Sequence, residues 1–142
     1  MSTSSATATA TATYDVTMEA IVRYAGASGD FTPMHYDTSA LEAAGYDTFF
    51  AMGMLAAGRL GGLVAATYGD EQVRSLRTRF RARSDVGTTV TLRLHPSEVV
   101  DADGCLHLRL EAVDDHGTVI VDGEARIAPT TIHTDTDRTP DA

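Results

Sequence analysis

A carboxylate and an imidazole lie five residues apart in the segment Tyr24–Asp37, which reads Y-A-G-A-S-G-D-F-T-P-M-H-Y-D. Asp30 and His35 are therefore the first candidates for acid-base chemistry. A glycine before the aspartate frees the backbone at a helix end, and the proline between the two residues favours an extended turn. Such a turn can aim both side chains at one point. A purely structural turn is the alternative, because Gly-Asp is a common helix exit and Thr-Pro a common helix entry.

A nearly continuous run of small and apolar residues follows, from Ala51 to Tyr68. We interpret this run as one buried helix, since it is too short to span a membrane and its glycines permit close contact with a sheet. A helix whose first turn contains Gly53 offers free backbone N–H groups and the positive end of a macrodipole, which would suit a developing oxyanion. An ordinary core helix is the alternative.

The segments G-D-F-T-P-M-H and A-M-G-M-L together resemble the hydratase motif of the MaoC-like, (R)-specific enoyl-CoA hydratases, which are hotdog-fold proteins. The resemblance extends from about Tyr14 to Ala128. It implies that Asp30 and His35 handle the reacting water and that Gly53 supplies a backbone N–H to the oxyanion. No metal and no organic cofactor is implied.

The chain departs from the family pattern near the motif. Met52 stands where the family usually has a histidine before the glycine, and Thr32 stands where asparagine is usual. Gly61 lies near a position that bears a serine in some members. These departures leave Asp30 and His35 untouched, so they bear on the substrate, the rate and the orientation of the pair more than on the reaction class.

The resemblance implies an α+β hotdog fold, in which a curved antiparallel sheet wraps around a central apolar helix. The residue pattern predicts four strands after that helix, at Val73–Arg83, Thr88–Val99, Cys105–Val113 and Thr118–Ile127. Close turns between these strands indicate antiparallel hairpins.

Three shorter elements are predicted before the apolar helix. A strand runs from about Ala10 to Val16, and a helix capped by Thr17 ends near Gly29 and delivers the aspartate. A second, short helix ends at Gly45 and is capped by Asp37 or Ser39. With 142 residues, of which 43% are hydrophobic, we expect one domain over residues 10–129 with disordered tails at 1–9 and 130–142.

Composition excludes several classes of partner. A formal net charge of -9 argues against nucleic acid and anionic membranes. Cys105 is the single cysteine, so no internal disulfide and no paired-cysteine zinc site is expected. The start of the chain lacks a basic segment followed by an apolar core, and a cytoplasmic protein is therefore predicted.

Other polar residues receive structural interpretations. The alternating Arg77, Arg79, Arg81 and Arg83 would share one solvated face of a strand, the alternative being contact with a CoA phosphate or an acidic carrier protein. Surface positions are expected for the remaining histidines, His95, His107, His116 and His133. His35-Tyr36-Asp37 contains two possible metal ligands without a third at a recognisable spacing, so no metal site is predicted.

An apolar substrate pocket is predicted from Phe49, Phe50, Met52 and Met54, for which plain core packing is the alternative. The predicted function is a hydratase/dehydratase that interconverts 2-enoyl and 3-hydroxyacyl thioesters of CoA or acyl carrier protein, in fatty acid or polyketide metabolism. Two alternatives remain: a non-catalytic subunit that binds an acyl thioester or completes a heterodimer, which Met52 supports, and a thioesterase in which Asp30 activates water toward the carbonyl. The resemblance also implies a homodimer.

Overall fold

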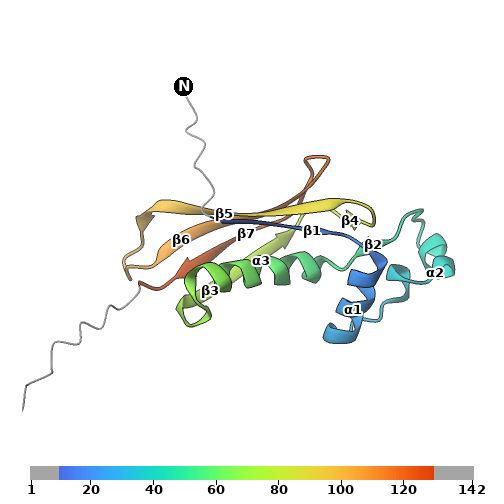
Figure 1. Ribbon diagram of the computed structural model, residues 1–142, viewed down its shortest axis with the longest axis horizontal. Coiled ribbons are helices and arrows are strands. Elements are labelled where there is room, and N and C mark those ends of the chain that lie inside the picture. The colour runs from blue at the N-terminus through green and yellow to red at the C-terminus, as the bar shows by residue number, and fades with distance from the viewer. Residues whose placement is uncertain (1–9, 130–142) are drawn as a thin grey trace, which may run out of the picture.

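A five-stranded antiparallel sheet forms the body of the molecule in the computed structural model, which describes residues 10–129 (Figure 1). The strands are β1 (Ala10–Asp15), β3 (Val73–Phe80), β5 (Thr89–Val100), β6 (Leu106–Asp114) and β7 (Val119–Ile127). Their order across the sheet is β1-β5-β6-β7-β3, and each neighbouring pair is antiparallel. The predicted tails, 1–9 and 130–142, and His133 within the second, lie outside the described residues.

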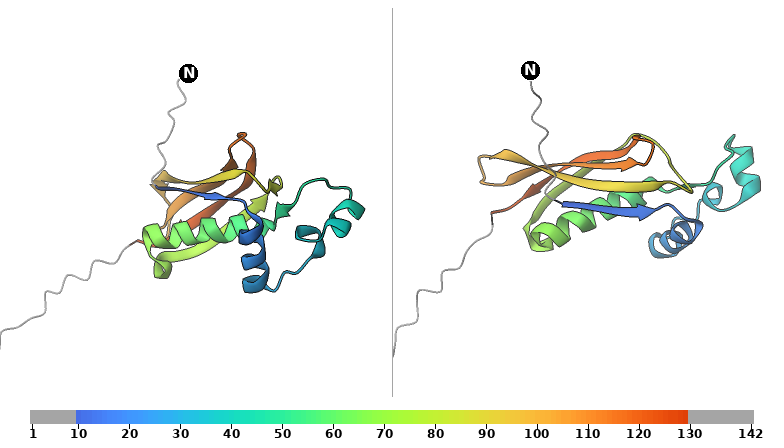
Figure 2. Two further views of the ribbon diagram at one scale, coloured as in Figure 1. Left: turned by 45° about the vertical axis from the view of Figure 1, so that its right-hand side comes forward. Right: turned by 45° about the horizontal axis from the view of Figure 1, so that its top comes forward.

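The long helix α3 (Gly53–Tyr68) lies along one face of this sheet (Figures 1 and 2). Its residues Leu60 and Val64 are completely buried, and inward-facing strand residues such as Leu94 and Leu110 are buried as well. Burying one such side chain contributes about 1.5–3 kcal/mol to folding, so this layer supplies much of the stability. The predicted arrangement of one apolar helix against an antiparallel sheet is confirmed. None of the helices in residues 10–129 is long and apolar enough to cross a membrane.

The segment between β1 and α3 adds short elements at one end of the molecule. These are α1 (Met18–Ser28), the 3-10 turn η1 (Pro33–His35), α2 (Thr38–Ala43) and β2 (Phe50–Ala51). The Thr17 hydroxyl caps α1 by accepting the Ala20 N–H at 3.1 Å, as predicted. Asp37, one of the two predicted caps, starts α2 by accepting the Ala40 N–H at 2.9 Å. Figures 1 and 2 show α2 projecting from the body of the molecule.

Two predicted elements are shorter than the sequence pattern indicated. The predicted helix from Ala51 begins two residues later, because Ala51 belongs to β2 and pairs with Ser84 of β4 (Ser84–Asp85). The strand predicted to reach Arg83 ends at Phe80, and a short turn η2 (Asp70–Gln72) precedes it. The N–H groups of the two residues that follow Phe80 both point at one acceptor, the Ile120 carbonyl, at 2.9 and 3.3 Å. Two successive N–H groups on one acceptor form a β-bulge, which interrupts the alternation of side chains along the strand.

The opposite end of the sheet is held by a hydrogen-bonded carboxylate. Asp101, in the turn between β5 and β6, accepts hydrogen bonds from Arg126 at 2.8 Å and from His107 at 3.0 Å. The N–H groups of Asp103 and Cys105 donate to it as well, both at 3.0 Å. Burial by itself would raise the pKa of Asp101, but these four donors hold it far below its ordinary value.

Candidate active site

Asp30 follows the end of α1, where the chain turns through Gly29. Gly29 has a φ of 76°, and its N–H closes the helix on the Ala25 carbonyl at 2.9 Å. The Asp30 carboxylate then accepts the Thr32 hydroxyl at 2.7 Å and the Thr32 N–H at 3.2 Å. The hydroxyl and then the N–H of Thr32 lower the pKa of Asp30. The side chain is therefore a carboxylate at neutral pH and can act as a base.

His35 ends the 3-10 turn η1 and is buried. Its Nδ1 lies 2.8 Å from the backbone carbonyl oxygen of Phe50. A carbonyl can only accept, so Nδ1 carries the proton and the Nε2 of the neutral imidazole keeps its lone pair. The imidazole also meets the Phe50 ring edge to face, with centroids 5.0 Å apart. These two contacts with one residue fix both the tautomer and the orientation of the ring.

The first turn of α3 presents unused backbone donors. Met52 occupies the cap position and provides no side-chain hydrogen bond to the helix, and the Leu55 N–H turns back to the Met52 carbonyl at 3.0 Å. The N–H groups of Gly53 and Met54 therefore have no partner in the helix, at the positive end of its macrodipole. A Cβ at Gly53 would lie 2.8 Å from the Phe80 ring, so glycine is what allows Phe80 to pack over this turn.

One pocket of about 450 Å³ brings the predicted catalytic residues together. Asp30, His35 and Gly53 all contribute to its wall, although they come from the end of α1, from η1 and from α3. The predicted lining residues Phe50, Met52 and Met54 are also part of this wall. A carboxylate, an imidazole with a free Nε2 and backbone N–H groups thus face one partly apolar space, which is a suitable arrangement for moving a proton beside a developing oxyanion.

Phe49 is a predicted lining residue that does not contribute to this wall. Its carbonyl accepts the Val86 N–H at 2.8 Å, which fixes the backbone just before β2. Phe49 precedes β2 and is half-buried, whereas Phe50, the first residue of β2, meets His35 edge to face.

Several wall residues at the end of β3 and just beyond it were not predicted from the sequence. Phe80, Arg81, Arg83 and Ser84 line the pocket together with Ile120 of β7. The sequence feature that could have indicated these residues is the run of alternating arginines, which the strand pattern assigns to one face of a strand. Because β3 ends at Phe80, the residues beyond it turn toward the pocket.

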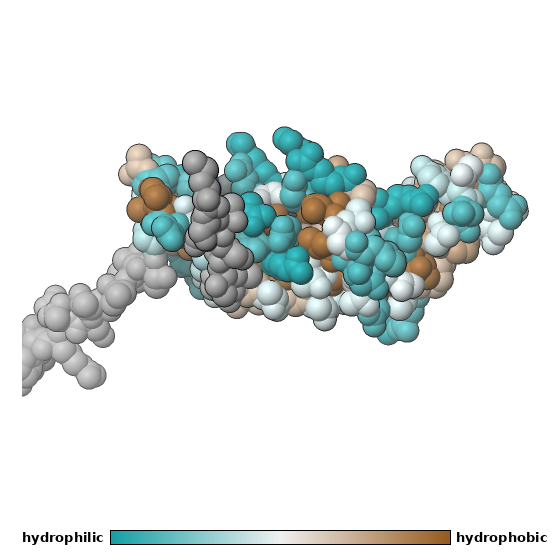
Figure 3. Space-filling model, turned by 90° about the horizontal axis from the view of Figure 1, so that it is seen from above, coloured by the Kyte–Doolittle hydropathy of each residue, from teal (hydrophilic) through white to brown (hydrophobic). Residues whose placement is uncertain are grey.

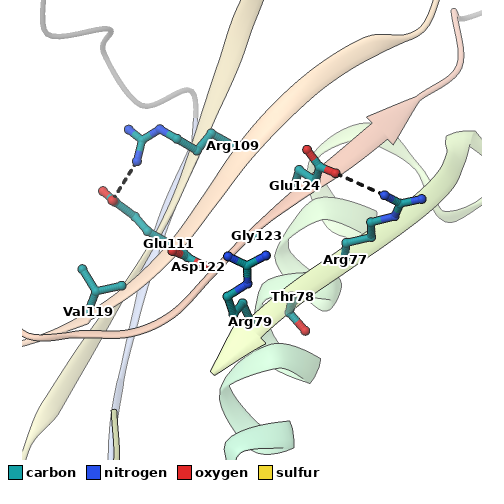
Figure 4. Close-up of a pocket in the computed structure, with 9 residues that line it drawn as sticks. All are labelled: Arg77, Thr78, Arg79, Arg109, Glu111, Val119, Asp122, Gly123 and Glu124. Atoms are coloured by element: carbon teal, nitrogen blue, oxygen red, sulfur yellow. Dashed lines mark hydrogen bonds and ion pairs between the residues drawn. The ribbon is translucent and has the colours of Figure 1, made fainter. Parts of the chain in front are cut away.

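The four arginines are exposed, as predicted, but they do not share one strand face, because β3 ends before Arg81. Arg77 and Arg79 lie on the sheet face turned away from α3, which Figure 3 shows to be mostly hydrophilic, whereas Arg81 and Arg83 reach the pocket. Figure 4 shows the residues that line a cavity on that outer face. The volume of this cavity is about 490 Å³. Its charged lining residues are Arg77, Arg79, Arg109, Glu111, Asp122 and Glu124. Three of these six charges are positive and three are negative, so the cavity has little net charge.

The other histidines lie away from the pocket. His107 and His116 have exposed side chains, as predicted. His95 does not, because its side chain is only 12% exposed and its Nε2 lies 2.9 Å from Glu111. Burial by itself would raise the pKa of Glu111, but hydrogen bonds from His95 and Arg109 lower it. Within residues 10–129, no group of three His, Cys, Asp or Glu residues is placed to hold a metal ion.

Comparison with known proteins gives a family and a set of similar folds. The model of the MaoC like domain matches residues 2–113, and no curated protein matches the chain. The (R)-hydratase from A. caviae involved in PHA biosynthesis has a similar structure, with 21% identity and a TM-score of 0.75 over 89% of this chain and 98% of that one.

Two complexes from Mycobacterium tuberculosis also contain similar chains. The match to the ChsH1-ChsH2 complex has 20% identity and a TM-score of 0.75, and it covers 89% of this chain and 98% of that one. The match to the C-terminally truncated HadBC (3R-hydroxyacyl-ACP dehydratase) complex has 16% identity and a TM-score of 0.63, over 82% and 90%. These structures share the hotdog fold. Because the family model covers most of the sequence, the chain belongs to the MaoC-like dehydratase domain family.

Proposed function

We propose that this protein is a hydro-lyase that interconverts 2-enoyl and 3-hydroxyacyl thioesters, carried on CoA or on acyl carrier protein. The observation that supports this most directly is the pocket in which Asp30, His35 and the first turn of α3 meet. Membership of the MaoC-like family supports the same reaction class.

In the hydration direction, a water molecule between the Asp30 carboxylate and Nε2 of His35 loses a proton as its oxygen bonds to the β carbon. The electron pair of the C=C bond moves toward the thioester, and negative charge collects on the carbonyl oxygen. The acid-base pair then returns a proton to the α carbon. The net change is the addition of one water molecule, and dehydration is the reverse.

The enolate oxygen would accept hydrogen bonds from the free N–H groups at the start of α3, chiefly from that of Gly53. One such donor is typically worth about 3 kcal/mol of transition-state stabilisation, so the helix terminus matters as much as the acid-base pair. The apolar side chains of Phe50, Met52 and Met54 would contact the acyl group.

A panel of enoyl and 3-hydroxyacyl thioesters tests the function of the purified protein. Formation of 3-hydroxyacyl product from the enoyl thioesters supports the proposal, whereas release of free thiol indicates a thioesterase. Absence of turnover with every thioester would support a subunit that needs a partner. That last reading is the second candidate, because Met52 offers no polar group to the pocket and two of the similar chains come from complexes.

We also propose that two copies pair along β3. This strand lies at the edge of the described sheet, and its Leu76 and Phe80 are exposed. An exposed edge strand with apolar side chains favours pairing with another strand. Light scattering should give the mass of a dimer, and Leu76→Lys should give a monomer. Val22→Lys, at an exposed apolar position on α1, is the control that should stay dimeric.

A further inference from the structure

A chain of contacts connects Arg83 to the His35 imidazole. The guanidinium carbon of Arg83 lies 4.8 Å from the centre of the Tyr46 ring and 5.3 Å from the centre of the Phe50 ring. These two rings meet edge to face, with centroids 5.0 Å apart. Phe50 in turn packs edge to face against His35. Arg83 therefore stacks on the residue that holds the imidazole.

The charge of Arg83 is already neutralised by a neighbour. Its Nε lies 3.1 Å from one carboxylate oxygen of Asp85, and an Nη nitrogen donates to the other oxygen at 3.3 Å. Asp85 is also the residue that faces Phe50 across the β2–β4 pair. The ion pair thus fixes the guanidinium beside Phe50 and leaves it poorly suited to bind an anionic group of a substrate.

Phe50 needs such support because β2 contains only two residues. Two-residue pairing leaves the direction of a carbonyl weakly determined by the backbone alone. The Phe50 carbonyl must nevertheless stay within hydrogen-bond distance of Nδ1 to keep the proton on that nitrogen. Stacking of the Arg83 cation on the Phe50 ring restrains this residue.

We propose that Arg83 is a positioning residue for His35. By stacking on Tyr46 and Phe50 it holds the Phe50 carbonyl against Nδ1, and it thereby favours the tautomer in which Nδ1 carries the proton and Nε2 does not. The catalytic consequence rests on the proposed hydratase function, whereas the effect on the imidazole does not.

The test compares the full chain with Arg83→Met, Arg83→Lys and a matched control. Labelling with ¹⁵N-histidine reports by NMR which imidazole nitrogen carries the proton, and a His35→Gln variant assigns the signals. Arg93→Met is the control, because Arg93 is 39% exposed and ion-paired to Glu111, much as Arg83 is 38% exposed and ion-paired to Asp85. Arg93 lies on β5, away from the pocket.

In Arg83→Met we expect His35 to become a mixture of tautomers and kcat to fall about tenfold while KM changes by less than about threefold, as for a misaligned base. Arg83→Lys should recover part of both losses, since it keeps the cation, and Arg93→Met should match the wild type. Unchanged His35 signals with kcat within about twofold of wild type would overturn the proposal.

A second variant keeps the test decisive if Arg83→Met does not fold. Tyr46→Leu removes one of the two rings and leaves the ion pair with Asp85 in place. A partial shift of the His35 tautomer in this variant supports the proposal, and unchanged signals overturn it. If the wild type shows no hydratase activity while the tautomer still responds to Arg83→Met, the proposed function fails and the positioning role stands.

Discussion

Replacing Gly53 by alanine tests whether the start of α3 binds the oxyanion. The added Cβ would lie 2.8 Å from Cδ1 and 3.0 Å from Cε1 of the Phe80 ring. Carbon atoms in contact are ordinarily about 3.5–4.0 Å apart, so the ring must move by about 1 Å. Phe80 can move, because it is 53% exposed.

The expected effects on stability and on activity differ in size. Alanine favours a helix over glycine by up to about 1 kcal/mol, and this gain offsets the disturbed packing of Phe80. The free energy of unfolding should therefore change by less than about 1 kcal/mol. The methyl group and the displaced ring would crowd the space beside the Gly53 N–H. Loss of one oxyanion donor lowers kcat by about 10²–10³-fold, and we expect a fall of about 100-fold.

The assay measures kcat and KM on an enoyl thioester, and the melting temperature, for each variant. Gly58→Ala is the matched control on the same helix, because a Cβ there has no neighbouring atom within 4 Å. It should keep kcat and gain up to about 1 kcal/mol of stability. Adding Phe80→Ala to Gly53→Ala should restore part of the lost kcat. A Gly53→Ala protein with wild-type kcat would refute the oxyanion role of this turn.

Three further predictions concern the acid-base pair, the pocket and the sheet. Asp30→Asn should stay folded and lose about two or more orders of magnitude of hydration rate, and His35→Ala should lose a similar amount. The double variant should lose no more rate than either single variant, because the two residues act as one unit. Near-normal turnover by folded Asp30→Asn would contradict the assignment. Met52→His should weaken binding of apolar acyl groups by about 1–3 kcal/mol, because Met52 is buried in the pocket wall; a uniform rise in kcat/KM on every acyl group would reject this reasoning. Asp101→Asn should lower the melting temperature at neutral pH. Because the pKa of Asp101 is lowered in the folded state, its carboxylate stabilises the fold at pH values above the unfolded pKa of about 4, and this stabilisation is lost as the pH falls below that value. The difference in melting temperature between wild type and Asp101→Asn, measured by calorimetry, should therefore shrink in acid. A difference that does not vary with pH would exclude this ion pair as its cause.

The fold was largely predictable because its signals are local. The apolar run that ends at Tyr68 forms a helix, and the buried side of this helix packs on the sheet. Alternation along Val90, Leu92 and Leu94 predicts a strand with one buried face, and that face lies on α3. Most observed strand ends differ by one residue from the predicted ends, since turn residues mark a boundary only approximately.

The details of the site were less predictable because they depend on backbone groups and on distant segments. The contact that sets the tautomer of His35 is a carbonyl of Phe50, and any residue type supplies such an acceptor. Nothing in the alternating arginines showed that β3 would end at Phe80 and turn Arg83 toward the pocket. His95 looked like a surface residue because Glu111, the residue on β6 that its side chain contacts, is sixteen residues away in the sequence.

The location of the acid-base pair has a consequence for thermal inactivation. Asp30 and His35 belong to the segment between β1 and α3, which adds no strand to the five-stranded sheet and includes the projecting helix α2 (Figure 1). In α2 only Leu41 is buried, and segments with few buried apolar contacts open at lower free energy than the core that supports them. Heating should therefore release this segment before the sheet melts, so that catalysis fades at temperatures where circular dichroism still reports an intact β-structure.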